Sequence, residues 1–140
     1  MDFILFVKLP PDNIIRAIMN CTYKDKRHQY GADAENLVAD KYLEWGYELV
    51  SKRYRTPCGE LDLIMKKDHT LIFIEVKARR DPNTDEYISQ SQIKRNCNAA
   101  NFFLYTYEYY QNHDVRFDLA VVSSSGIYDI IENAWMSDSA

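Results

Sequence analysis

Apolar side chains recur at helical spacing in two stretches of the chain, residues 32–45 and about 90–110. They lie three or four positions apart, which places them on one face of an α-helix. Gly46 is well placed to end the first helix. The residues expected to be buried are Ala34, Leu37, Val38, Tyr42 and Trp45 in the first helix and Ile93, Cys97, Ala100, Leu104 and Tyr107 in the second.

Five short segments between and after these helices are predicted to be strands. They are rich in β-branched and aromatic residues and are bounded by turn residues. The predicted strands are residues 47–54, 60–66, 70–77, 117–122 and 127–132. The order of helix, three strands, helix and two strands is typical of an α/β domain. We therefore expect a central mixed five-stranded sheet flanked by helices in residues 31–140.

Residues 1–30 differ from the rest of the chain. Pro10 and Pro11 interrupt an early apolar run, and residues 23–30 are polar and charged. We expect an N-terminal extension, with a short helix near residues 12–20, joined to the domain that follows.

Composition and charge narrow the class of protein. The chain carries a net charge of −4, which argues against coating nucleic acid by charge alone. Residues 49–100, however, hold ten Lys and Arg against seven Asp and Glu. Three cysteines without a CxxC pair favour unpaired thiols in a reducing compartment. With neither a signal peptide nor a long apolar run, the sequence predicts a soluble, cytoplasmic protein.

Two neighbouring predicted strands carry the candidate chemistry, in residues 59–64 and 73–77. Side chains alternate between the faces of a strand, so Glu60 and Asp62 are expected on one face, and Glu75 and Lys77 share a face of the next strand. Pairing through the short turn can bring Asp62 beside Glu75, although the sequence does not fix the register. Two adjacent carboxylates repel each other, and a divalent ion with oxygen ligands, such as Mg²⁺, removes that cost. A nearby lysine can then orient or deprotonate a water, which suits phosphodiester hydrolysis.

A structural explanation competes with this one, because Glu-x-Lys is common on strands and acids on solvent-facing positions are ordinary. The charges of Glu75 and Lys77 nevertheless interrupt a run, residues 72–77, that otherwise has the pattern of a buried strand. Charged residues in such a strand need partners or a metal.

The linked motifs resemble the PD-(D/E)xK nuclease superfamily, which has a restriction-endonuclease-like fold. More closely, residues 31–136 resemble the YraN-like family of small bacterial proteins. The matching segments are residues 31–35, 42–43, 46–47, 54–55, 59–64, 74–79, 92–95, 116–118 and 133–135, together with Ala39. Arg53 departs from the family pattern, since an asparagine is usual there.

The resemblance implies a role for each matching position. Asp62, Glu75 and the backbone carbonyl of Val76 would hold Mg²⁺ or Mn²⁺, and Lys77 would be the catalytic lysine. Glu35 matches a helix glutamate that archaeal Holliday-junction resolvases place near the metal. The resemblance to these resolvases implies branched or structured DNA as the substrate. Because the resolvases act as dimers, it also implies a homodimer. The residues implied to contact DNA are Arg55, Arg79, Gln92, Lys94 and Arg95.

Several features keep two interpretations. Glu60 is either an alternate metal ligand or a base that contacts the ligands rather than the metal. Arg53, Arg55, Arg79 and Arg80 suit phosphate binding, but ion pairs at a strand edge explain them equally well. Residues 102–110 place aromatic side chains on several faces of the predicted helix. This arrangement suits base stacking but is more typical of a helix that packs in the core and at a dimer surface. The three histidines lack zinc-ligand spacing and are predicted to lie at the surface.

Two functions follow from the sequence. The first is a metal-dependent endonuclease that hydrolyses DNA. The second is a nucleic-acid-binding module that keeps the fold without turnover. A third, a protein-interaction domain using the aromatic helix, is less well supported because it leaves Asp62, Glu75 and Lys77 without a role.

Overall fold

The computed structural model describes residues 29–80 and 88–136. Within them lie the helices α3 (Gln29–Glu44) and α4 (Gln90–Thr106) and the short 3₁₀ helix η1 (Glu108–Tyr110). The strands are β1 (Glu48–Thr56), β2 (Gly59–Lys67), β3 (Thr70–Ala78), β4 (Asp114–Ser123) and β5 (Gly126–Trp135). The predicted α/β fold with a mixed five-stranded sheet is confirmed. The predicted helix at residues 12–20 lies outside the described residues.

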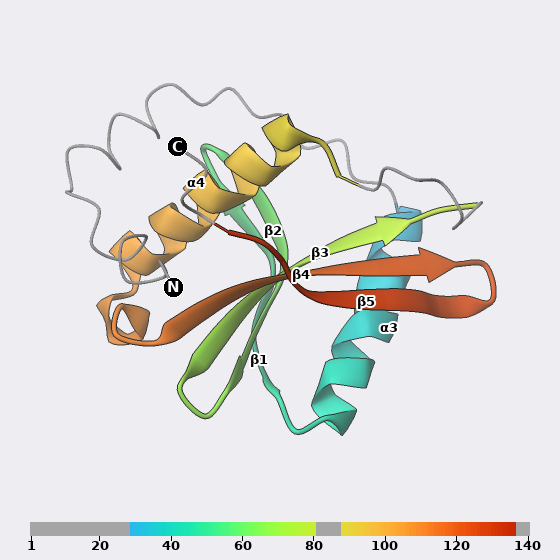
Figure 1. The fold of residues 1–140 in the computed structure, drawn as a ribbon, viewed down its shortest axis with the longest axis horizontal. Helices are drawn as coiled ribbons and strands as arrows, with labels where there is room; N and C mark the ends of the chain where they lie inside the picture. The colour runs from blue at the N-terminus through green and yellow to red at the C-terminus, as the bar shows by residue number, and fades with distance from the viewer. Residues whose placement is uncertain (1–28, 81–87, 137–140) are drawn as a thin grey trace.

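The strands follow their chain order across the sheet, β1-β2-β3-β4-β5 (Figure 1). Neighbours are antiparallel except β3 and β4, which are parallel. Parallel neighbours need a long crossover connection, and α4 lies in the connection between these two strands. This architecture is consistent with a restriction-endonuclease-like fold.

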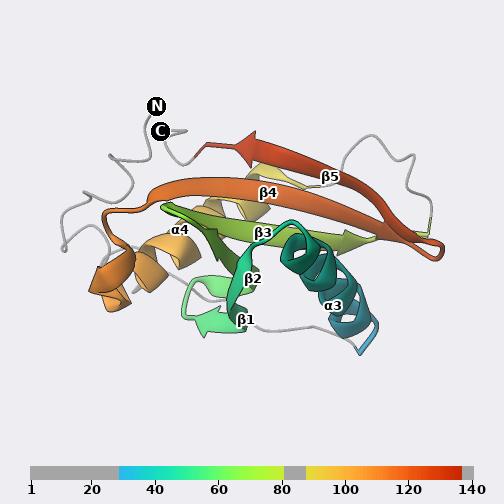
Figure 2. The same cartoon turned by 90° about the horizontal axis from the view of Figure 1, so that it is seen from below.

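Two apolar clusters form the core, one on each side of the twisted sheet. Leu71 and Phe73 of β3 pack in the cluster that contains α4, whereas Ile72 and Ile74 pack in the cluster that contains α3. This alternation follows from the pleat of a strand buried on both faces. In Figure 2 α3 lies near the carboxyl end of β3, the end at which Glu75 and Lys77 are located.

Both helices differ at their ends from the sequence prediction. Helix α3 begins at Gln29, inside the predicted extension, and Leu37 and Trp45 are exposed rather than buried. Helix α4 ends at Thr106 instead of continuing to Tyr110. The Gln111 side chain donates to the Leu104 carbonyl at 2.9 Å and so satisfies a carbonyl that the helix end leaves open. Because the helix has ended, Tyr107 is 45% exposed and is not part of the predicted buried stripe.

Two further predictions need correction. His113 is buried, and its ring stacks on that of His69, so it is not the surface residue predicted from the sequence. Cys97 is a buried thiol, as expected, but Cys58 is disulfide-bonded. No helix in the described part of the chain is both long and apolar enough to span a membrane.

A buried ionic network holds β4 and β5 against α3. Asp118 is fully buried and accepts two hydrogen bonds from Arg116, both at 2.8 Å. Tyr42 of α3 donates its hydroxyl to the same carboxylate at 2.6 Å, and the backbone N–H of Asn133 donates at 3.0 Å. These donors replace the water that Asp118 loses on burial. The matched segments 116–118 and 133–135 therefore have a structural role.

We expect Asp118→Asn to lower the free energy of unfolding by about 3 kcal/mol, because the partly buried guanidinium of Arg116 then loses its closest charge partner and keeps only the longer contact with the exposed Glu132. Urea denaturation measures the change. Asp129→Asn, an exposed carboxylate on β5, is the matched control and should change stability by less than about 0.5 kcal/mol. Equal effects of the two substitutions would contradict the structural role of Asp118.

Candidate functional site

The strands β2 and β3 separate at Asp62. Their pairing runs from the turn as far as Leu63 and Ile74, and one further step would pair Asp62 with Glu75. Instead, the Asp62 side chain accepts the backbone N–H of Val76 at 2.8 Å, between Oδ2 and N. Asp62 is buried, with 6% of its surface exposed. The register thus brings the two predicted carboxylates to the same level of the sheet.

The pairing of β1 with β2 is interrupted at the same level. Lys52 pairs with Leu63 and Tyr54 with Leu61 in one register, while the intervening residues, Arg53 and Asp62, are left out of the ladder. Leu61 packs in the α4 cluster and Leu63 in the α3 cluster, so side-chain alternation breaks at Asp62. The strict alternation predicted for this strand therefore does not hold there, and the Asp62 carboxylate binds the Val76 N–H of β3.

Glu75 and Lys77 form a buried ion pair beside Asp62. The Lys77 Nζ lies 2.8 Å from Glu75 Oε2, and the two side chains are only 13% and 12% exposed. Burial, reinforced by the negative charge of Asp62, raises the pKa of Glu75 to about 7, although Lys77 opposes the shift. Two acidic side chains thus lie close together at low exposure, which is a condition that a bound cation relieves.

The donor set fits a magnesium ion. The Val76 N–H points to Asp62, and in an extended strand the carbonyl of a residue points to the same side as its N–H, so the Val76 carbonyl also faces this gap. Two carboxylates and one carbonyl are hard oxygen ligands, and Mg²⁺ commonly keeps several waters beside such a small set. In the described ranges no group of three or more His, Cys, Asp and Glu residues could hold a metal. The predicted oxygen set, and not a larger acidic cluster, is therefore the candidate ligand set.

Glu35 is held by Arg53 of β1. The Arg53 Nε lies 2.9 Å from Glu35 Oε1, and the Glu35 side chain is only 3% exposed. Arg53 has a φ of 51°, in the left-handed region that asparagine adopts more readily than other non-glycine residues. This conformation would suit the asparagine that the family resemblance places at this position. The sequence left Arg53 as either a phosphate ligand or a member of an ion pair, and the structure places it in an ion pair with Glu35.

Glu60 and Arg55 form another ion pair, with 3.3 Å between Oε2 and Nε. The Glu60 side chain is buried and the Arg55 side chain is 76% exposed, so the pair runs from the interior to the surface. Arg79 donates from Nη1 to the Ala78 carbonyl at 3.1 Å and from its backbone to the Val122 carbonyl at 2.8 Å.

The residues predicted at the start of α4 divide into two kinds. Gln92 completes a capping box with Ser89: its Oε1 accepts the Ser89 N–H at 3.1 Å, and its own N–H is donated to Ser89 Oγ at 3.2 Å. Lys94 and Arg95 are exposed. Arg95 Cβ lies 3.8 Å from where a Cβ on Gly59 would be, so this turn of the helix lies over the start of β2.

Fold and buried charges together define a class: an α/β protein, consistent with restriction-endonuclease-like architecture, with two carboxylates and a lysine where its central strands separate. The model of the uncharacterised protein family UPF0102 matches residues 34–122, and the chain belongs to this family. The chain is similar to a UPF0102 protein of Ruegeria pomeroyi, at 40% identity over 79% of this chain and 90% of the relative. It is also similar to one of Corynebacterium efficiens, at 37% identity over 71% and 81%. The predicted YraN-like family membership is confirmed.

The raised pKa of Glu75 predicts how stability depends on pH in metal-free protein. The unfolded carboxyl titrates near its ordinary value of 4.5 and the folded one near 7. Since protonation favours the folded state, this contribution is complete below pH 4.5 and is lost as the pH rises through 7. Glu75→Gln should therefore be more stable than wild type above pH 7, by on the order of 2 kcal/mol, and the difference should shrink toward pH 4.5.

Thermal unfolding in EDTA between pH 4 and 9 tests this expectation. Glu44→Gln serves as the control, because the Glu44 side chain is 68% exposed on α3. As a surface substitution it should change stability by less than about 0.5 kcal/mol across this range. A difference for Glu75→Gln that does not grow as the pH rises from 4.5 to 7 would contradict the raised pKa.

Proposed function

We propose that this protein is a magnesium-dependent nuclease that hydrolyses DNA phosphodiester bonds. One observation carries the proposal: Asp62, Glu75 and Lys77 meet at low exposure where β2 and β3 separate. A structural ion pair would need one carboxylate per lysine, whereas here burial, reinforced by the charge of the second carboxylate of Asp62, raises the pKa of Glu75 to about 7. Such a shift at a specific charge cluster is typical of functional sites.

Asp62, Glu75 and the Val76 carbonyl would hold the ion. When bound, Mg²⁺ or Mn²⁺ supplies Lewis-acid polarisation of the phosphate and lowers the pKa of a coordinated water. Asp62 is pre-positioned for this role, because its bond to the Val76 N–H fixes the carboxylate against β3. Preorganised ligands avoid the cost of ordering them when the ion binds.

Lys77 would act on the attacking water and on the phosphate. Its Nζ donates to Glu75 Oε2 and is 13% exposed at the side chain, so it is held in place yet reachable. An ammonium group there can orient a water by hydrogen bonding and offset the negative charge that grows on the phosphate oxygens. Glu35, held by Arg53, would support the site from α3.

The DNA would contact exposed basic side chains around the site. Arg55, Lys94 and Arg95 are exposed, and guanidinium groups bind phosphates through paired N–H donors. A preference for branched or structured DNA and action as a homodimer are proposed from the resemblance to resolvases alone. A DNA substrate also implies a cytoplasmic location.

In Mg²⁺ or Mn²⁺, wild type should cut at least one of linear, single-stranded, flapped or four-way-junction DNA. Asp62→Asn removes a carboxylate charge and Lys77→Ala an ammonium group, so each should slow cleavage by at least about 100-fold. Gel assays of end-labelled DNA measure the rates, with EDTA abolishing cleavage.

Two matched variants control for changes in charge and folding. Asp68→Asn alters an exposed residue in the turn joining β2 and β3, and Lys41→Ala a half-exposed residue of α3 whose ion-pair partner is the exposed Glu44. Both should cut at the wild-type rate. If wild type binds DNA without cutting it, and Asp62→Asn binds equally well, the alternative of a binding module without turnover replaces the nuclease.

A further inference from the structure

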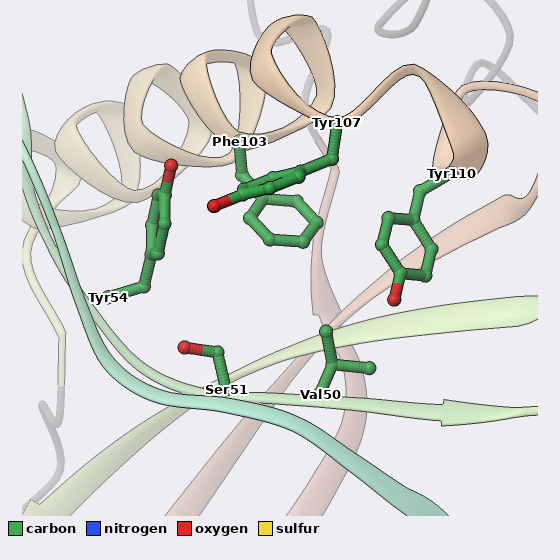
Figure 3. Close-up of a pocket in the computed structure, with 6 residues that line it drawn as sticks. All are labelled: Val50, Ser51, Tyr54, Phe103, Tyr107 and Tyr110. Carbon is green, nitrogen blue, oxygen red and sulfur yellow. The ribbon is translucent and has the colours of Figure 1, made fainter.

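An aromatic pocket opens between β1 and the end of α4, and none of the acidic residues discussed above lines it. It has a volume of about 220 Å³ and is lined by Val50, Ser51, Tyr54, Phe103, Tyr107 and Tyr110. Figure 3 shows Tyr107 lying across Phe103, with Tyr54 and Tyr110 to either side and the two β1 residues Val50 and Ser51 on the opposite wall. The pocket is smaller than the roughly 300–1,000 Å³ of sites for drug-sized ligands, so it suits one small planar group.

The walls provide aromatic faces at different depths. The ring centroids of Phe103 and Tyr107 lie 4.9 Å apart, and those of Phe103 and Tyr110 lie 5.4 Å apart. Phe103 is 2% exposed and Tyr107 is 45% exposed, so the aromatic wall runs from the core to the surface. The hydroxyls of Ser51 and Tyr110, which line the pocket, can each donate and accept hydrogen bonds. An apolar peptide side chain would leave these hydroxyls unused, whereas a heterocycle with polar edges would use them.

The strand that forms one wall carries an exposed cation next to the pocket. The Arg55 side chain follows the pocket residue Tyr54 and is 76% exposed, and its Nε also pairs with Glu60. Lys52 and Arg53 instead reach Asn36 and Glu35 of α3, on the other side of the sheet. Phosphates attract such cations, and single-stranded nucleic acid is commonly bound by stacked aromatics beside basic side chains. This charge selects a nucleotide over a neutral aromatic ligand.

We propose that the pocket binds one unpaired nucleobase of a DNA strand, with Arg55 of β1 contacting the adjoining phosphate. The proposal rests on the proposed action on DNA and specifies its substrate as DNA with an unpaired nucleotide. A base inside a duplex is stacked on its neighbours, so entry into the pocket selects bulged, flapped or single-stranded positions.

Two DNA hairpins test the proposal, one with a single bulged thymidine and one with an abasic site at that position. Binding is measured by fluorescence anisotropy without divalent metal, and cleavage is measured separately with Mg²⁺. Wild type should bind the bulged hairpin about 10-fold tighter, the scale of one base stacked on aromatic side chains. Tyr107→Ala should abolish this preference.

Tyr105→Ala is the matched control, because Tyr105 is also 45% exposed and lies two residues away but does not line the pocket. It should keep the preference. Ser51→Trp fills the pocket without truncating an aromatic side chain, so it should lose the preference even if Tyr107→Ala unfolds.

The outcomes distinguish failure of the base-binding proposal from failure of the nuclease proposal. If wild type cleaves DNA and all variants keep an equal preference for the bulge, the base-binding proposal is wrong and the nuclease proposal is unaffected. No cleavage, with the preference lost in Tyr107→Ala and Ser51→Trp only, supports the pocket and overturns the nuclease. A change of oligomeric state in Tyr107→Ala and Ser51→Trp without a change in the preference would overturn the pocket as a base site and identify an interface between copies of the chain.

Discussion

The hydrogen bond from the Val76 N–H to the Asp62 carboxylate determines how the candidate site is built. It takes the place of a strand-to-strand bond at the point where β2 leaves β3. A backbone N–H left open there would be costly, so the separation of the strands requires an acceptor from a side chain. Asp62 supplies it, and in doing so brings a second carboxylate next to Glu75. The backbone and the charge cluster are thus parts of one arrangement.

The protein buries carboxylates in two ways on neighbouring strands. Asp118 of β4 is surrounded by donors from Arg116, Tyr42 and the Asn133 backbone, which compensate its charge within the protein. Glu75 of β3 has Lys77 as an ion-pair partner but lies against Asp62, and burial together with the Asp62 charge raises its pKa. The first arrangement stabilises the fold. The second places two acidic side chains close together at low exposure, an arrangement that a bound cation would stabilise.

The sequence predicted the order and approximate bounds of every described strand, because alternation and β-branched residues directly reflect burial in the sheet. It also selected Asp62 and Glu75, since charges inside an apolar strand need partners. The same logic applies to Asp118. One of its hydrogen-bond donors, Tyr42, lies 76 positions away in sequence, so no local pattern could identify it. The break in alternation at Asp62 could not be predicted either, because no pattern within the β2 sequence marks the interrupted pairing with β1.

Arg53 connects these observations. A left-handed conformation costs an arginine about 1 kcal/mol or more, so a residue persists there only where its surroundings fix it. The surroundings are the interrupted pairing opposite Asp62 on one side and the buried Glu35 on the other. An asparagine would adopt the backbone conformation at lower cost but would leave Glu35 without this cation. In this chain the arginine therefore exchanges backbone strain for charge compensation, at the same level of the sheet as the two carboxylates.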